Sequence, residues 1–136
     1  MATSKVIYQG ELHTEATHLL SSTTIVTDAP LDNQGRGAAF SPTDLVATAL
    51  ASCSLTIIGQ AANTHGFDIT GAEVEVTKIM QASPRKIAEI VLNFVFPNDS
   101  YSDKQKAIIE NSIHTCPVAK SLDPAIKQTI NITYRA

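Results

Sequence analysis

One uncharged stretch, residues 45–64, constrains the fold more than any other feature. Ser41 and Pro42 before it suit the cap and first position of a helix, and Gly66 after it suits the residue that ends one. A helix of this size is about 30 Å long, which is also the length of a membrane span. Seven Ser, Thr, Gln and Asn residues make the stretch too polar for lipid. We therefore expect a buried core helix and no membrane insertion.

The predicted helix has apolar residues on nearly every side, so it needs covering on several sides. The 136 residues are enough for one domain, spanning residues 1–136, but are few to enclose such a helix alone. Charged residues make up only 17% of the chain, against about 25% in ordinary soluble domains. Both observations predict that a second copy covers part of the surface, as in a homodimer.

Charge excludes two classes of partner. The formal net charge is -3, and no basic cluster offers a footprint for nucleic acid or for an anionic membrane surface. Residues 1–10 lack the apolar core of a signal peptide. We therefore expect a cytoplasmic protein that binds neither nucleic acid nor membrane.

The remaining pattern predicts an α+β fold with a mostly antiparallel sheet and two main helices. Alternating apolar residues indicate strands, and Ser102 with Gln105 forms a capping box at a second helix. We expect strands at residues 5–8 and 23–27, an early loop at 9–15, a second loop at 28–37, the long helix, a hairpin of 72–80 and 87–96 with its turn at 83–86, the second helix from Ser102 toward Cys116, a restart at Pro117, and a last strand near 126–134.

The chain has two cysteines, Cys53 and Cys116. Two are too few for a disulfide-rich scaffold or for a zinc site made of cysteines within one chain. The count leaves three alternatives: two inert core thiols, one structural disulfide, or one redox pair.

Helix position sets different conditions for the two thiols. Cys53 lies about nine residues into the predicted helix, beyond the first turn over which the helix dipole acts. A reactive thiolate there needs a cation from elsewhere, and Arg36 or a histidine are the candidates. Cys116 precedes Pro117 near the start of a helical turn, where a thiolate is modestly favoured.

Two segments of the sequence resemble the signatures of the OsmC/Ohr family of thiol peroxidases. They are Gly35-Arg36-Gly37 continuing through Phe40-Ser41-Pro42-Thr43-Asp44-Leu45 to Ser52-Cys53, and His114-Thr115-Cys116-Pro117-Val118-Ala119-Lys120-Ser121-Leu122. The resemblance implies an OsmC-like fold, an intertwined homodimer with active sites at the subunit interface, Cys53 as the peroxidatic thiol and Cys116 as the resolving thiol. It further implies organic hydroperoxides as substrates, a dithiol reductant of lipoyl or thioredoxin-like type, a role in oxidative stress defence, and no metal or organic cofactor.

The helper residues depart from the family pattern. Peroxidases of the family pair the reactive cysteine with an arginine from an early loop and a glutamate ten residues before the cysteine. Here that position is Thr43, with Asp44 beside it, and the early loop has His13 but no arginine. His13, Arg36 and Asp44 are therefore the candidate helpers of Cys53. Asp44 also suits the first turn of the helix as a simple dipole charge.

Two other functions fit the same residues. A non-redox dimer could hold an apolar ligand in its cleft, which the apolar helix and the missing arginine–glutamate pair favour. Alternatively, Cys53 could act as an acyl-transfer nucleophile with His13 as its base. We expect structural or solvated roles for the other histidines, which are His18, His65 and His114.

Overall fold

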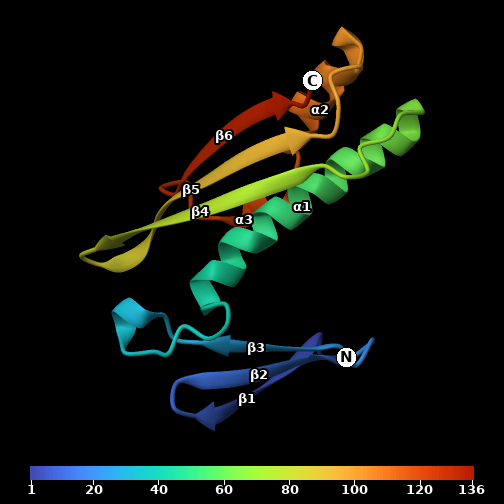
Figure 1. Cartoon of the computed structure of the whole chain (residues 1–136). Helices are drawn as coiled ribbons and strands as arrows, with labels where there is room; N and C mark the ends of the chain where they lie inside the picture. The colour runs from blue at the N-terminus through green and yellow to red at the C-terminus, as the bar shows by residue number, and fades with distance from the viewer. The chain divides into compact units, whose positions relative to one another are not determined.

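The computed structural model describes residues 1–136 (Figure 1). The chain forms two compact units, Met1–Val46 and Ala47–Ala136. Each is described in turn.

The first unit is a three-stranded antiparallel sheet in the order β1-β2-β3. The predicted strands at 5–8 and 23–27 are confirmed as β1 (Ser4–Gly10) and β3 (Thr24–Asp28). The prediction of a loop at residues 9–15 is wrong, because β2 (His13–His18) begins within it. Glu11 and Leu12, both left-handed with φ of 53° and 60°, make a tight two-residue turn instead. His13 is therefore the first residue of a strand.

Apolar side chains of this sheet lie exposed. Val6, Ala16 and Ile25 are paired across the three strands and so share one face, where Val6 is 61% exposed and Ile25 49%. Every residue of β1 except Gly10 is exposed. Of the thirteen large hydrophobic residues exposed in the chain, all but Ile79 lie within residues 1–46. The sheet therefore leaves an apolar face without a core of its own.

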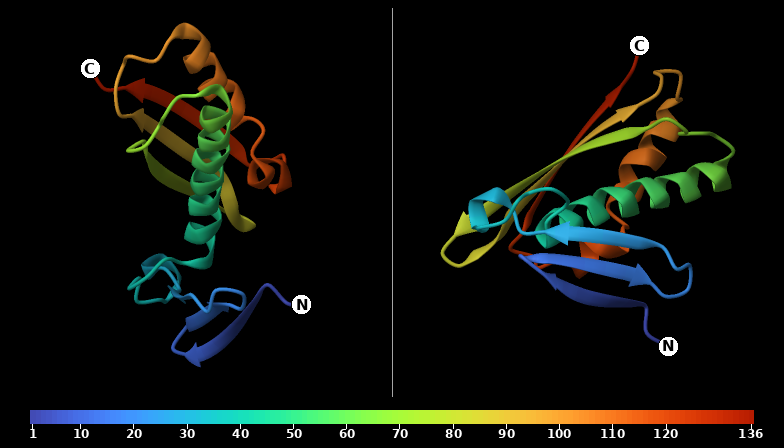
Figure 2. Two further views of the ribbon diagram at one scale, coloured as in Figure 1. Left: turned by 90° about the vertical axis from the view of Figure 1, so that its right-hand side faces the viewer. Right: turned by 60° about the horizontal axis from the view of Figure 1, so that its bottom comes forward.

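The second unit packs helices on one face of another three-stranded sheet, in the order β4-β5-β6. Strands β4 and β5 are antiparallel, whereas β5 and β6 are parallel because α2 and α3 form the crossover between them. Figure 2 shows α1 and α2 on the same side of this sheet. The elements are α1 (Pro42–His65), β4 (Glu73–Ala82), β5 (Arg85–Phe96), α2 (Asp103–Ile113), α3 (Pro117–Ser121) and β6 (Lys127–Tyr134).

The core lies between this sheet and the helices. Alternate residues of β5, among them Leu92 and Phe94, are at most 1% exposed, as a strand with one covered face requires. Leu50 and Ile58 of α1 and Ile109 of α2 belong to the same buried cluster. The predicted α+β class, with mostly antiparallel strands and two main helices, is confirmed.

Helix α1 satisfies the length and composition of a membrane span, with a mean hydropathy of 1.6 over its most apolar 18 residues. Core helices of globular proteins satisfy the same criterion. The buried residues of α1 recur at helical spacing, which gives the helix one face turned into the core. They are Ala47, Leu50, Ala51, Ser54, Ile58 and Ala62. We therefore interpret α1 as a core helix.

The helix starts follow the predicted capping. Ser102 Oγ accepts from the Gln105 N–H at 3.1 Å, and Gln105 Oε1 accepts from the Ser102 N–H at 2.9 Å, which completes the capping box of α2. Helix α2 ends at Ile113, and α3 restarts at Pro117 as predicted, with Cys116 as its N-cap residue. This restart sets the position of the second cysteine.

Candidate functional site: a pair of free thiols

Cys53 and Cys116 lie together in the second unit. Cys53 projects from α1 and is partly buried, whereas Cys116 is 0% exposed within the core. Both are free thiols, and Cys116 is close enough to Cys53 to raise the pKa of its thiol. Two segments that are 63 positions apart in the sequence are thus brought into contact by the packing of the α2–α3 junction against α1.

The surroundings of Cys53 hold it as a neutral thiol. Burial is the main cause that raises its pKa above the ordinary 9.0, and the hydrogen bond and charge of Cys116 raise it further. The only opposing influence is the backbone N–H of Val118, which lowers the pKa. No cation is among these influences. Residues 47–136 thus supply no cation that would stabilise a Cys53 thiolate, which agrees with the sequence-based inference that a cation must come from elsewhere.

Val118 is a neighbour of Cys53 that the sequence reasoning did not single out. The first backbone N–H groups of a helix have no partner within the helix, and Pro117 occupies the first position of α3. The N–H of the next residue, Val118, is then free to donate to the sulfur of Cys53. The signal in the sequence was the Cys116-Pro117 pair itself, because it marks a helix start immediately after a cysteine.

A second polar cluster lies in the first unit, around the carboxylate of Asp28. His13 Nδ1 and Asp28 Oδ1 are 2.6 Å apart, and the backbone N–H of Ala38 donates to Asp28 Oδ2 at 3.1 Å. Arg36 Nη2 is 3.7 Å from Asp28 Oδ1, and Arg36 Nη1 is 3.7 Å from Glu11 Oε2. The two predicted cations, His13 and Arg36, therefore meet at one carboxylate.

Asp28 is the residue that organises this cluster, and the sequence reasoning placed it only in a loop. Its side chain is 1% exposed, and the hydrogen bond with His13 is the main cause that lowers its pKa, with the Ala38 N–H and the charges of His13 and Arg36 acting in the same direction against burial. An ionised carboxylate only accepts hydrogen bonds, so His13 donates from Nδ1. This orients the imidazole and leaves Nε2 as its second functional atom.

Asp28→Asn should destabilise the protein in a pH-dependent way. Because the folded-state pKa of Asp28 is lowered, its contribution is present above its ordinary pKa near 3.8 and is lost as pH falls through the lower folded value. We expect a lower urea midpoint for the variant at pH 7 and a smaller difference from wild type at pH 3. Glu75→Gln, at an exposed position of β4, is the control and should leave the midpoint at pH 7 unchanged. A variant difference that is equal at both pH values would contradict this role.

Asp44, the third predicted helper, caps α1. Asp44 Oδ2 accepts from the Ser41 backbone N–H at 2.9 Å, and Ser41 Oγ accepts from the Asp44 N–H at 3.1 Å. This reciprocal pair is a capping box with aspartate in place of glutamate. Ser41 Oγ also lies 3.2 Å from Thr43 Oγ1. These contacts of Asp44 fit the alternative role, in which it is a negative charge in the first turn that stabilises the helix dipole.

The structure joins the predicted residues in two groups. Cys53 and Cys116 are in contact within residues 47–136, and His13 and Arg36 share Asp28 within residues 1–46. That His13, Arg36 or Asp44 assists Cys53 in its chemistry stays a prediction. No group of three or more His, Cys, Asp or Glu side chains is arranged to hold a metal ion.

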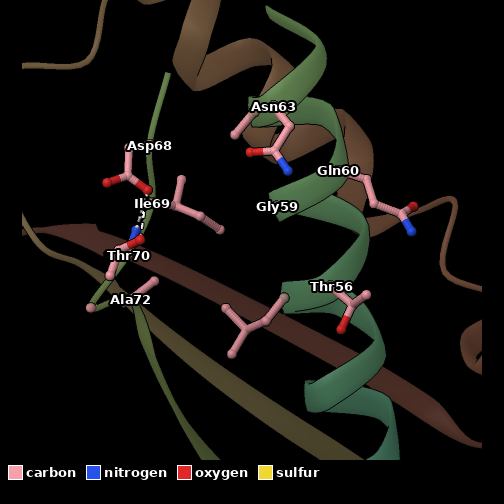
Figure 3. A pocket seen from close by; sticks show the side chains of 11 residues that line it. Thr56, Gly59, Gln60, Asn63, Asp68, Ile69, Thr70 and Ala72 are labelled. Atoms are coloured by element: carbon pink, nitrogen blue, oxygen red, sulfur yellow. Dashed lines mark hydrogen bonds between the residues drawn. The ribbon is translucent and has the colours of Figure 1, made fainter. Parts of the chain in front are cut away.

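Two cavities lie in the second unit, and neither is lined by a cysteine. The larger, about 440 Å³, lies between the second half of α1 and the segment that leads into β4. Figure 3 shows Asn63 on the side of α1 that faces this segment, whereas Gln60 points away from it. Asp68 lines this cavity, and its Oδ1 already accepts hydrogen bonds from the backbone N–H and the hydroxyl of Thr70. The smaller cavity, about 220 Å³, lies beside α3.

The fold and the thiol pair define an α+β protein with two neighbouring cysteine side chains. A sequence profile of the OsmC-like protein family matches residues 35–131, which include both cysteines. The chain belongs to this family. None of the curated proteins compared with the chain matches it.

Solved structures share the fold over the full chain. A Psychrobacter arcticus protein described as an osmotic stress induced and detoxification response protein is 54% identical, with a TM-score of 0.93 over 98% of this chain and 96% of that one. An OsmC-like protein from Mycoplasma pneumoniae is 19% identical, with a TM-score of 0.81 over 98% and 96%. An organic hydroperoxide resistance protein OsmC from Legionella pneumophila is 15% identical, with a TM-score of 0.76 over 98% of each chain.

Proposed function

We propose that this protein is a cytoplasmic thiol peroxidase that reduces organic hydroperoxides in oxidative stress defence. The observation that carries the proposal is the contact between two free thiols, one partly exposed and one fully buried. The relatives described as detoxification response and organic hydroperoxide resistance proteins support the same function.

The two thiols and an external dithiol complete a catalytic cycle. The Cys53 thiolate attacks the terminal oxygen of ROOH; the O–O bond breaks, Cys53 becomes a sulfenic acid, and RO⁻ takes a proton to leave as ROH. The Cys116 thiol then attacks the sulfenic sulfur, which forms a disulfide and releases water. A dithiol of lipoyl or thioredoxin-like type reduces the disulfide and is itself oxidised, so that both thiols are restored. The two electrons that reduce the peroxide thus come from the external dithiol.

The first step needs a thiolate, and the surroundings of Cys53 within its unit oppose one. We propose that the cation is His13, oriented by Asp28, with Arg36 contributing positive charge. The carboxylate of Asp28 supports the proposal, because its hydrogen bond with Nδ1 orients the imidazole. Asp44 would act indirectly, by fixing the start of the helix that carries Cys53.

His13→Ala should slow the oxidation of Cys53 by roughly tenfold or more at neutral pH. A nearby opposite charge lowers a pKa by about 1–3 units, and its loss reduces the thiolate fraction accordingly. His13→Arg should restore much of the rate, since it restores a cation. His18→Ala, on the same strand, is the control and should react like wild type. Equal rates for His13→Ala and wild type would exclude His13 as the cation.

We propose a homodimer as the working form. The apolar face of β1-β2-β3, with Val6, Tyr8 and Ile25 all at least 49% exposed, supports it, because a three-stranded sheet needs its apolar face covered. The resemblance that predicts two active sites at a subunit interface agrees with this requirement.

Stopped-flow oxidation tests the proposed function directly. The reduced protein is mixed with cumene hydroperoxide or with hydrogen peroxide, and free cysteine at the same pH is the reference. We expect the protein to react faster than free cysteine with cumene hydroperoxide, and more slowly with hydrogen peroxide than with cumene hydroperoxide. Oxidation no faster than that of free cysteine would overturn the peroxidase proposal.

A further inference from the structure

The smaller cavity lies beside α3, and neither cysteine lines it. Residues from α1, from the end of α2, from α3 and from β6 line its 220 Å³. Leu50 and Ile113, which are 1% and 3% exposed, give it apolar walls together with Ile130. The one buried polar side chain, Ser54, donates to the Leu50 carbonyl at 2.9 Å. Its hydroxyl hydrogen is thus already used, so the interior is suited to hydrocarbon.

Positive and hydrogen-bonding groups lie among the remaining lining residues. Lys120 and His114 are exposed and make no ion pair, and no Asp or Glu lines the cavity. Gln128 donates from Nε2 to the Ala119 carbonyl at 3.1 Å, which holds its amide at the cavity. One end of a ligand would therefore meet a cation and hydrogen-bond donors, while the rest would meet apolar side chains.

We propose that this cavity binds a short-chain aliphatic carboxylate. The carboxylate pairs with Lys120 and His114, and the hydrocarbon chain packs against Leu50, Ile113 and Ile130. The volume supports a small ligand, because pockets for drug-sized molecules measure about 300–1,000 Å³. The charge of Lys120 disfavours an amine, and an apolar molecule without a carboxylate would gain nothing from this lysine.

Titration of the reduced, full-length protein with hexanoate, followed by NMR of backbone amides and methyl groups, tests the proposal. We expect saturable shifts of the Ile113 and Ile130 methyl groups and of the Gln128 amide. Hexan-1-ol, which has the same chain without the charge, should bind about fivefold more weakly, in line with one exposed ion pair. Absence of shifts at these groups, or equal affinity for the alcohol, would overturn the proposal.

Variants of the cation sharpen the result. Lys120→Met should weaken hexanoate binding about fivefold and leave hexan-1-ol binding unchanged, whereas Lys120→Arg should preserve both. Lys104→Met, which removes an exposed lysine of α2 that does not line the cavity, is the control and should have no effect. An unchanged hexanoate affinity in Lys120→Met would contradict the proposed pairing. No peroxide is present, so this result stands or falls independently of the peroxidase activity.

Discussion

Cys53→Ser should abolish the reduction of organic hydroperoxide, with a fall in rate of roughly a thousandfold or more, to the uncatalysed level. A serine hydroxyl at this position cannot accept the peroxide oxygen to give a sulfenic acid, and Cys116 is 0% exposed, so no accessible thiol replaces Cys53. The measurement is consumption of cumene hydroperoxide with dithiothreitol as the dithiol. Thr64→Ser, near the end of the same helix, is the control and should keep the wild-type rate.

Cys116→Ser separates the two thiols when the reduced protein is mixed with cumene hydroperoxide and no dithiothreitol is present. It should leave the first oxidation of Cys53 within about threefold of wild type, because it changes only the hydrogen-bonding neighbour of the reacting sulfur. Without the second thiol no intramolecular disulfide forms, so the sulfenic acid accumulates and dimedone adds to Cys53 in a mass spectrum. An intramolecular disulfide in wild type that survives in neither variant would support the two roles. Loss of the first oxidation in Cys116→Ser would contradict them.

Ile25→Glu should convert the proposed dimer into a monomer. Ile25 is 49% exposed in the single chain, at the β3 end of the apolar row that also contains Val6 and Ala16. A carboxylate there would have to be buried without a partner in any complex that covers this face, which costs several kcal/mol. Size-exclusion chromatography with light scattering measures the mass.

Thr24→Glu is the matched control for the dimer. It adds the same charge to the same strand, but Thr24 is paired with Thr17 on the opposite face of the sheet. We expect this variant to elute as wild type does. A wild-type protein with the mass of one chain would contradict the dimer, and dissociation of both variants would contradict the assignment of the interface to the face of Ile25.

The long helix and the second helix could be predicted because their signals are local. Pro42 and Gly66 bracket α1, and the Ser102–Gln105 capping box starts α2, so chemistry within a few residues determined each boundary. The hairpin followed in the same way from alternation of apolar residues. Strand β2 was missed because its sequence, HTEATH, has no apolar alternation and is a strand only through its pairing with β1 and β3.

In the candidate site, too, the features set by local sequence could be predicted and those set by tertiary packing could not. The two cysteines could be chosen from their flanking residues, but their contact depends on where α3 packs, which no short segment encodes. Asp28 was missed because a single aspartate before a Pro-Gly-rich loop is typical of turns. Its role depends on His13 from the neighbouring strand.

The complete burial of Cys116 determines how the proposed cycle resets. In a Cys53–Cys116 disulfide, an external thiolate reaches only the sulfur on α1, so it forms its mixed bond with Cys53 and expels Cys116 as the leaving thiolate. The burial that keeps Cys116 away from peroxide thus also determines which sulfur of the disulfide the reductant attacks.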